Sequence, residues 1–289
     1  MRTLALISAA LALTAVAKPL TPPDIVASAP PAAWRSIPPD ELLVMDLKSG
    51  ARVVIQLAPA FAPVHVANIR TLARARWWDG AAIYRVQDNY VVQWGHNDGR
   101  KLPAGIITRP PAEYARPLAG LTVTRFPYRD SYAPRTGHVA GWPVALVDRT
   151  VSLTHCYGYV GVGRDLAPDT GTGGELYAVI GHGPRQLDRN IAVVGRIIAG
   201  IDELSSLPRG TEALGFYKQR SSDVPIASIK LASDLSADNR PKFEMMDTAS
   251  ASFLAYVTKR ANRQDDFYRR AAGGVDLCNA PVPVRPVKR

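Results

Sequence analysis

Short β-branched runs, each bounded by Gly, Pro, Asn or Asp, recur along this chain, and they constrain its fold more than any other feature. Runs of this kind separated by turn residues predict strands joined by short connections. Many such strands with few helices between them predict a closed or sandwiched all-β domain. The expected strands are residues 42–47, 52–57, 81–86, 90–93, 159–163, 176–180, 191–197 and 225–231.

Two central segments show helical spacing instead. Between residues 62 and 75, Val66, Ile69 and Leu72 recur on one face, which predicts an amphipathic helix. Residues 199–207 predict a second, shorter helix. Two helices among so many strands leave the domain predominantly β.

The segment around the first expected helix carries the most specific pattern. Ala62-Pro63-Val64-His65-Val66-Ala67-Asn68-Ile69 is followed by Ile83-Tyr84-Arg85-Val86 and then by Tyr90-Val91-Val92-Gln93-Trp94-Gly95. These three runs resemble the core signature of the cyclophilins, the β-barrel peptidyl-prolyl cis/trans isomerases. The resemblance covers roughly residues 40–236. It implies a closed eight-stranded antiparallel barrel capped by two helices.

The resemblance implies that Arg85 is the catalytic residue. Prolyl isomerisation breaks no σ bond, and its barrier of about 18–20 kcal/mol comes from amide resonance. A catalyst must favour the twisted amide, by holding the proline ring in an apolar pocket and placing a donor near the imide nitrogen. A guanidinium offers a rigid fork of donors that stays charged. The alternative is a surface arginine on an edge strand.

The same resemblance implies a substrate site around Arg85. Gln93 would hold the peptide backbone, unless it is an ordinary solvent-facing strand residue. Tyr90 and Val91 would form apolar walls, and Tyr177 would floor the proline pocket. The full set of residues expected to bind substrate is Gln93, Tyr90, Val91, Gly163, Arg164, Leu176, Tyr177, Leu187 and Ile191.

Two positions depart from the family pattern. Gln186 stands where a tryptophan is common, and Ile191 replaces the pocket histidine. These departures alter the pocket wall, so reduced activity or a different peptide preference is expected. They also leave open a non-catalytic peptide-binding module or chaperone that uses the same groove. A structural envelope protein, docked by its C-terminal helix, is a third reading.

The resemblance implies no metal or organic cofactor. The five histidines show no His-x-x-x-His spacing, and there is no Cys-x-x-Cys pair that would preassemble a metal site. Gly161-Val162-Gly163 lacks the rest of a dinucleotide fingerprint. His138 and His155 leave a serine or cysteine hydrolase open, although no Gly-x-Ser-x-Gly elbow is present.

The first residues predict a removable export signal at residues 1–17. Arg2 precedes an apolar run over residues 4–13, and Ala15-Val16-Ala17 offers a cleavage site. The run is too short to span a bilayer, so no stable membrane insertion is expected after cleavage. The alternative is a buried first helix. We therefore expect a secreted, periplasmic protein.

The chain is basic, with a formal net charge of +10, or +9 once Arg2 is removed. Such a surface attracts nucleic acid, anionic lipid or acidic polypeptides. Because the Lys and Arg residues are scattered along the sequence, a solvated surface is favoured and no nucleic acid partner is expected. The expected partners are proline-containing polypeptides, bound by a monomer.

Three further segments flank or interrupt the expected barrel. Residues 18–39 are rich in Pro and Ala and predict a flexible lead-in without helix or strand. Residues 97–156 are weakly patterned and predict an insertion or lid. Residues 237–289 form an extension with one amphipathic helix within 248–272.

The chain has two cysteines, Cys156 and Cys278. In an oxidising compartment they could form a disulfide that ties the tail to the body. Two separate buried thiols remain the alternative, because pairing cannot be derived without Cα distances.

Overall fold

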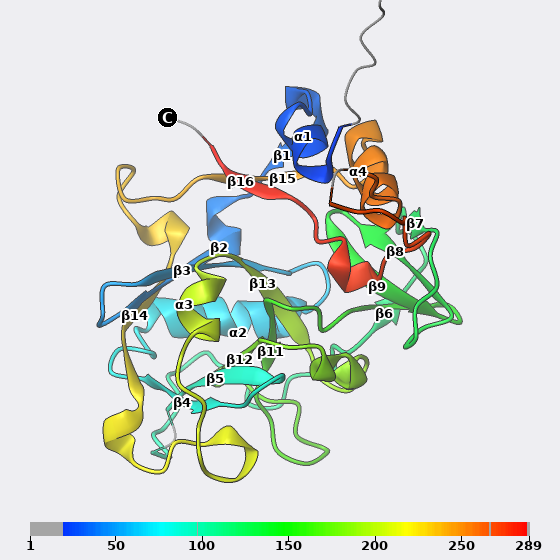
Figure 1. Ribbon diagram of the computed structural model, residues 1–289. Coiled ribbons are helices and arrows are strands. Elements are labelled where there is room, and N and C mark those ends of the chain that lie inside the picture. Colours follow the sequence, from blue (N-terminus) through cyan, green and yellow to red (C-terminus); the bar gives the residue numbers. More distant parts are fainter. Residues whose placement is uncertain (1–19, 97, 266, 288–289) are drawn as a thin grey trace, which may run out of the picture.

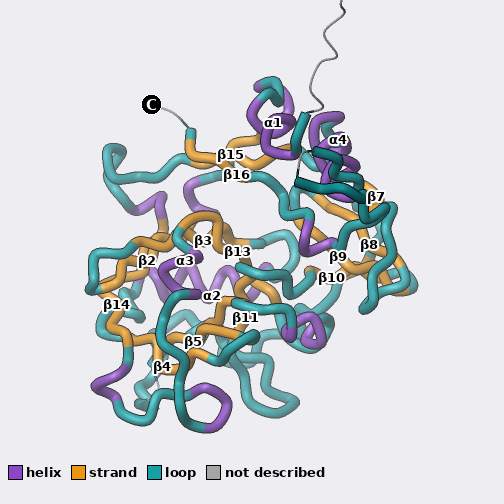
Figure 2. Tube along the Cα trace, in the orientation of Figure 1, coloured by secondary structure: helices purple, strands orange, loops and turns teal. Residues whose placement is uncertain are grey.

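The computed structural model describes residues 20–96, 98–265 and 267–287, so the expected export signal at residues 1–17 lies outside the described residues. Eight strands close into an antiparallel barrel in the order β11-β12-β5-β4-β14-β2-β3-β13 (Figures 1 and 2). This confirms the predicted fold class. The barrel strands are β2 (Leu42–Leu47), β3 (Arg52–Leu57), β4 (Ala82–Val86), β5 (Val91–Gly95), β11 (Tyr159–Val162), β12 (Leu176–Val179), β13 (Val193–Ala199) and β14 (Val224–Leu231).

Two helices close the barrel interior, as predicted. Helix α2 (Pro63–Arg74) and helix α3 (Ile201–Ser205) follow β3 and β13 in the chain. Ile69 and Leu72 of α2 and Leu204 of α3 have no exposed surface and belong to the same buried cluster as the inward-facing strand residues. Burial of side chains of this size contributes about 1.5–3 kcal/mol each, so the helices are part of the barrel core.

The segment between β5 and β11 contains a second sheet. Its five strands have the order β6-β10-β9-β8-β7. The segment predicted as an insertion or lid, residues 97–156, therefore contains a sheet of its own. Strand β9 is buried on both faces, so it reads as a continuous apolar run without the alternation that marks a half-exposed strand. The strands are β6 (Arg116–Pro117), β7 (Thr124–Phe126), β8 (Arg135–Val139), β9 (Trp142–Val147) and β10 (Thr150–Leu153).

The Pro-rich segment before the barrel is also structured, so the prediction of a lead-in without helix or strand is wrong. Helix α1 (Pro22–Ala27) has prolines at its first positions, where a backbone N–H has no intrahelical partner in any case. Thr21 and Asp24 form a capping box at its start. Strand β1 (Trp34–Ser36) then pairs with a strand from the far end of the chain.

The C-terminal residues complete this third sheet. Strands β15 (Phe243–Met246) and β16 (Val284–Pro286) continue from β1 in the order β1-β15-β16. Helix α4 (Ala251–Ala261) lies between them in sequence. It is shorter than the amphipathic segment predicted within 248–272, because Ser250 caps its first turn and the helical hydrogen bonds end at Asn262.

These outer parts form one unit, which we call the accessory lobe: residues 20–36, 116–153 and 243–287. Trp34, Phe126 and Phe253 share one buried cluster although they come from three different segments. In Figure 1, α1, α4 and strands β7 to β9 gather at the upper right, beside the barrel. Cys156 and Cys278 form a disulfide, which settles the alternative left open by the sequence.

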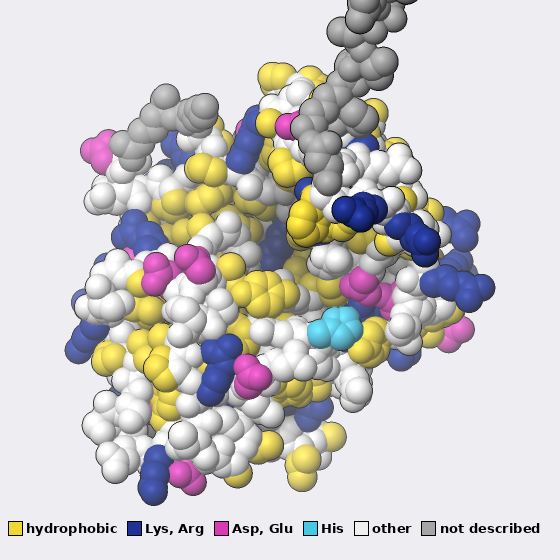
Figure 3. Space-filling view, in the orientation of Figure 1, with side chains coloured by type: hydrophobic (Ala, Val, Ile, Leu, Met, Phe, Trp, Pro, Cys, Tyr) yellow, Lys and Arg dark blue, Asp and Glu magenta, His cyan; other side chains and the backbone are white. Residues whose placement is uncertain are grey.

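The surface follows the scattered charge of the sequence. Figure 3 shows Lys and Arg side chains spread over one face among acidic and uncharged groups, with the densest grouping over the accessory lobe. Within the described parts of the chain, no helix is long and apolar enough to cross a membrane.

Candidate active site

One row of residues crosses four neighbouring barrel strands. Arg85 of β4 pairs with Gln93 of β5, and Gln93 pairs with Tyr177 of β12. Tyr177 in turn pairs with Gly161 of β11. Because side chains alternate between the two faces of a strand, all four positions lie on the outer face of the barrel. The structure therefore brings Arg85, Gln93 and Tyr177 together, as the resemblance implied.

A β-bulge adds Tyr84 to this face. The register of β4 against β5 shifts between Ile83 and Arg85, so that consecutive residues can turn outward. The ring of Tyr84 stacks on Phe216, with centroids 6.0 Å apart and planes at 10°. Its hydroxyl donates a hydrogen bond to Glu175.

The guanidinium of Arg85 is held from three sides. Its Nε donates to the carbonyl of Leu214 at 2.7 Å, and one terminal nitrogen donates to Gln93 Oε1 at 3.0 Å. The other terminal nitrogen donates to Gln87. Among the described residues these bonds use three of the five N–H donors of an arginine, so donors remain for a substrate. Burial lowers the pKa of Arg85 from its ordinary value.

The amide of Gln93 has a fixed orientation. Arginine can only donate, so the oxygen of the amide must face Arg85. The Nε2 of Gln93 then donates to the hydroxyl of Tyr84 at 2.9 Å and to Glu175 Oε2 at 3.2 Å. Gln93 thus links the cation to a carboxyl group just before the next strand, β12.

Glu175 is a site residue that sequence reasoning missed. It precedes β12 by one position, and alternation places it on the same face as Tyr177. Partial burial raises the pKa of Glu175 from its ordinary value of 4.5 to about 7. Glu175 could have been identified from the sequence, because it lies two residues before Tyr177 and alternation places both side chains on the same face. Phe216 and the carbonyl of Leu214 lie in an irregular loop, where no such signal exists.

An apolar surface adjoins the cation. Three buried side chains form its centre, those of Val91, Tyr177 and Val179. Three partly buried side chains border them, those of Tyr90, Leu187 and Ile191. The guanidinium carbon of Arg85 lies 5.8 Å from the centre of the Tyr90 ring. These side chains include all those predicted to enclose the proline ring, with Val179 as an addition.

Gly163 and Arg164 lie on the other side of Gln93. A Cβ added at Gly163 would stand 3.3 Å from Gln93 Nε2 and 3.1 Å from Glu175 Cβ, so only a very small residue fits. Together with Arg164 these residues line a cavity of about 350 Å³. The guanidinium of Arg164 donates to the carbonyls of Asp165 and Asn190. Both predicted residues are therefore near the row.

Leu176 is the exception among the predicted substrate-binding residues. It is 1% exposed and packs in the barrel interior with the inward-facing strand residues. The expectation that it belongs to the substrate site is wrong, because it occupies the opposite face of β12 from Tyr177. Of the two departures from the family pattern, Ile191 lies in the apolar surface and Gln186 is exposed.

The described residues contain no group of three or more His, Cys, Asp or Glu side chains that could hold a metal ion. Both cysteines are bonded to each other, which leaves no thiol to act as a nucleophile.

Comparison with known proteins supports the same interpretation. The family model described as "Cyclophilin type peptidyl-prolyl cis-trans isomerase/CLD" matches residues 42–231. Proteins of Brucella suis and Brucella abortus, each named "Probable peptidyl-prolyl cis-trans isomerase", are 25% and 24% identical over 175 residues, which is 61% of this chain and 75% of theirs.

A solved structure shares the fold beyond the barrel. The crystal structure of cyclophilin AquaCyp293 from Hirschia baltica superposes with a TM-score of 0.68 at 24% identity. The match covers 93% of this chain and 98% of that one, so the likeness extends to the accessory lobe.

Proposed function

The chain belongs to the cyclophilin family of peptidyl-prolyl cis-trans isomerases, and on this premise we propose that it isomerises X-Pro bonds of exported polypeptides with Arg85 as the catalytic residue. The observation that carries the proposal is the position of a guanidinium with unused donors at the edge of an apolar surface.

The reaction needs two things from the site. The apolar surface of Tyr90, Val91, Tyr177, Leu187 and Ile191 holds the proline ring by removing it from water. As the amide twists, the lone pair of the imide nitrogen localises and becomes an acceptor. A donor of Arg85 then stabilises the twisted form more than either planar form, which lowers the barrier. Gln93 holds the peptide backbone beside it.

Two features support exported clients and a periplasmic location. The pattern of residues 1–17 is that of an export signal. The disulfide between Cys156 and Cys278 suits an oxidising compartment. A role in folding follows from the rate of the uncatalysed reaction, because X-Pro isomerisation takes tens to hundreds of seconds and limits folding.

The activity is tested with the mature chain and a proline-peptide isomerisation assay. We expect acceleration over the uncatalysed rate, and a loss of about 100-fold or more in kcat/KM for Arg85→Ala. Arg85→Lys keeps the charge but not the fork of donors, so we expect it to recover only a small part of the loss. An uncatalysed rate for the unmodified chain overturns the proposal. Peptide binding without acceleration would favour the peptide-binding module instead.

The location is tested by cell fractionation. We expect the full chain to be shortened at its N-terminus and found in the periplasm, and a chain lacking residues 1–17 to stay in the cytoplasm. An unshortened chain in the cytoplasm contradicts the proposed location without touching the activity.

A further inference from the structure

Tyr177 is tied to a buried histidine behind the apolar surface. The hydroxyl of Tyr177 lies 2.9 Å from His155 Nε2, and the two rings stack with planes at 11° and centroids 6.2 Å apart. His155 lies between β10 and β11, and its side chain is 1% exposed. Burial also raises the pKa of Tyr177, so the hydroxyl keeps its proton.

The second ring nitrogen of His155 is held by Asp188. Nδ1 lies 3.0 Å from Asp188 Oδ1, and the same oxygen accepts the backbone N–H of His155 at 2.8 Å. An ionised carboxylate only accepts hydrogen bonds, so Nδ1 carries the proton. In the neutral ring Nε2 is then the acceptor for the hydroxyl of Tyr177. The carboxylate thereby sets the direction of the bond that holds the tyrosine.

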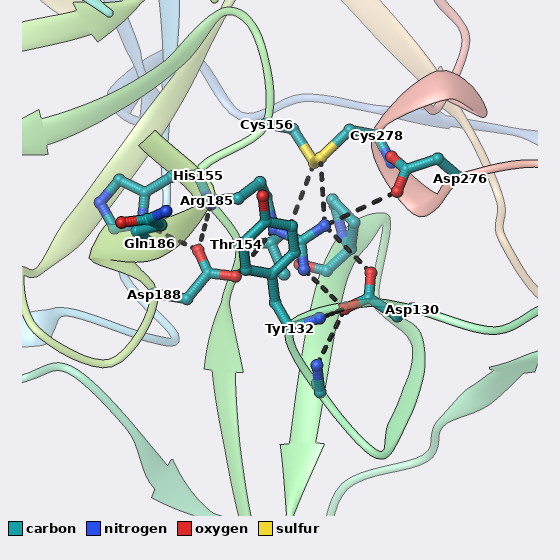
Figure 4. Close-up of polar contacts among 12 residues, drawn as sticks. Asp130, Tyr132, Thr154, His155, Cys156, Arg185, Gln186, Asp188, Asp276 and Cys278 are labelled. Atoms are coloured by element: carbon teal, nitrogen blue, oxygen red, sulfur yellow. Dashed lines mark hydrogen bonds and ion pairs between the residues drawn. A yellow bond between two sulfur atoms is a disulfide. The ribbon is translucent and has the colours of Figure 1, made fainter. Parts of the chain in front are cut away.

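Asp188 is in turn paired with Arg185, and this pair leads into the accessory lobe (Figure 4). Arg185 Nε donates to Asp188 Oδ2 at 2.9 Å. Its two terminal nitrogens donate to the two oxygens of Asp130 at 3.0 and 2.9 Å. Asp130 lies between β7 and β8. The side chains of Arg185, Asp130 and Asp188 are 0%, 1% and 5% exposed.

The surroundings leave the tyrosine ring one place to lie. A Cβ added at Gly161, its partner across the sheet, would stand 2.3 Å from both Cζ and Oη of Tyr177. The ring therefore lies directly over Gly161. The hydrogen bond to His155 fixes the far end of a ring whose face belongs to the apolar surface.

We infer that His155 is a positioning residue for the isomerase reaction, because it holds the Tyr177 ring in the surface that receives the substrate proline. The position of the Tyr177 ring therefore depends, through Asp188 and Arg185, on Asp130 of the accessory lobe. The inference rests on the proposed function, since it concerns the same apolar surface. It gives the lobe a part in substrate binding although none of its residues lies in the Arg85 row.

The test is a double-mutant cycle between His155→Ala and Tyr177→Phe, read as KM for a proline peptide. We expect His155→Ala to raise KM by roughly three- to tenfold, the factor one hydrogen bond is worth, with a smaller change in kcat. In the Tyr177→Phe background, which has no hydroxyl to hold, we expect His155→Ala to leave KM unchanged. A purely structural role of His155 would raise KM equally in both backgrounds, and that result overturns the inference.

Two further variants keep the test independent of misfolding. His155→Gln retains a side-chain acceptor near the position of Nε2, so we expect it to restore most of the loss of KM seen with His155→Ala. Asp130→Asn keeps the shape of the Asp130 side chain but removes its charge. We expect it to raise KM when Tyr177 is present and to leave KM unchanged in the Tyr177→Phe variant. If the unmodified chain has no isomerase activity, the proposed function has failed. If it is active and the cycle shows no coupling, only the positioning role has failed.

Discussion

The row around Arg85 and the core of the accessory lobe are assembled by contacts of different range. In the barrel, Arg85 and Gln93 lie on the hairpin of β4 and β5, only 8 residues apart in sequence. In the lobe, one buried cluster draws Trp34, Phe126 and Phe253 from three distant segments. The pairing of Arg85 with Gln93 is therefore local, whereas the support behind Tyr177 depends on contacts between remote parts of the chain.

The strongest test of this difference is at the link between the two regions. Arg185→Met removes the cation shared by Asp130 and Asp188 and leaves both carboxylates buried. We expect the free energy of unfolding to fall by about 3–5 kcal/mol, the cost of breaking a buried pair from one side. Urea unfolding measures it. Arg149→Met, at an exposed turn of the lobe, is the matched control and should change stability by less than about 0.5 kcal/mol. Equal effects of the two variants would mean that the network does not join the regions.

Next in size is the disulfide. The double variant Cys156→Ala, Cys278→Ala frees a loop of 122 residues, and we expect a loss of about 2–4 kcal/mol. Hydrogen exchange should show where the loss falls. We expect the amides of β15 to exchange faster than before and those of β2 to change little. Uniform acceleration in both sheets would contradict the idea that the lobe depends on this bond more than the barrel does.

A smaller change is expected within the lobe alone. Ser250 accepts a hydrogen bond from the backbone N–H of Phe253 at 3.1 Å and caps α4. Ser250→Ala should lower the free energy of unfolding by about 1 kcal/mol. Ser252→Ala, inside the same helix, should not lower it, because alanine is the better helix former. An unchanged melting temperature for Ser250→Ala would show that the cap does not contribute.

The last prediction is a change in pH dependence and concerns Glu175 in the barrel. The folded protein holds the proton of this carboxyl up to about pH 7, whereas the unfolded chain loses it near 4.5. The free energy of unfolding therefore falls as the pH rises through this window. Glu175→Gln should remove that part of the pH dependence and leave the rest of the profile as it was. Identical profiles for the two proteins, from thermal unfolding between pH 4 and 8 in steps of about one unit, would contradict it.

The sequence predicts the barrel, where the contacts are local, better than it predicts the accessory lobe. The resemblance to the cyclophilins implied Arg85 and Gln93 as site residues, and alternation along one hairpin indicated that their side chains could lie side by side. Leu176 was misplaced because adjacent strand residues face opposite sides, so an error of one position moves a side chain from the core to the surface. In these cases the pattern was local, and so were the errors.

The lobe and the network behind Tyr177 could not be predicted in this way. His155 and Asp130 lie in connections without periodicity, and their roles depend on Asp188 and Arg185 from elsewhere in the chain. Strand β1 lies among prolines, which by themselves argue against a strand, and only its pairing with β15 overrides that local preference. A sequence pattern of a few residues cannot indicate contacts between segments this far apart in the chain.

The pairing of β1 with β15 also sets an order of events during synthesis. Arg35 and Asp247, which meet beside this pairing, are 212 residues apart, and the last barrel strand, β14, ends at Leu231. All strands of the barrel are therefore synthesised before β15. Until then β1 has no neighbour in its sheet. The barrel of this protein can close around its core while strand β1 still lacks its partner β15.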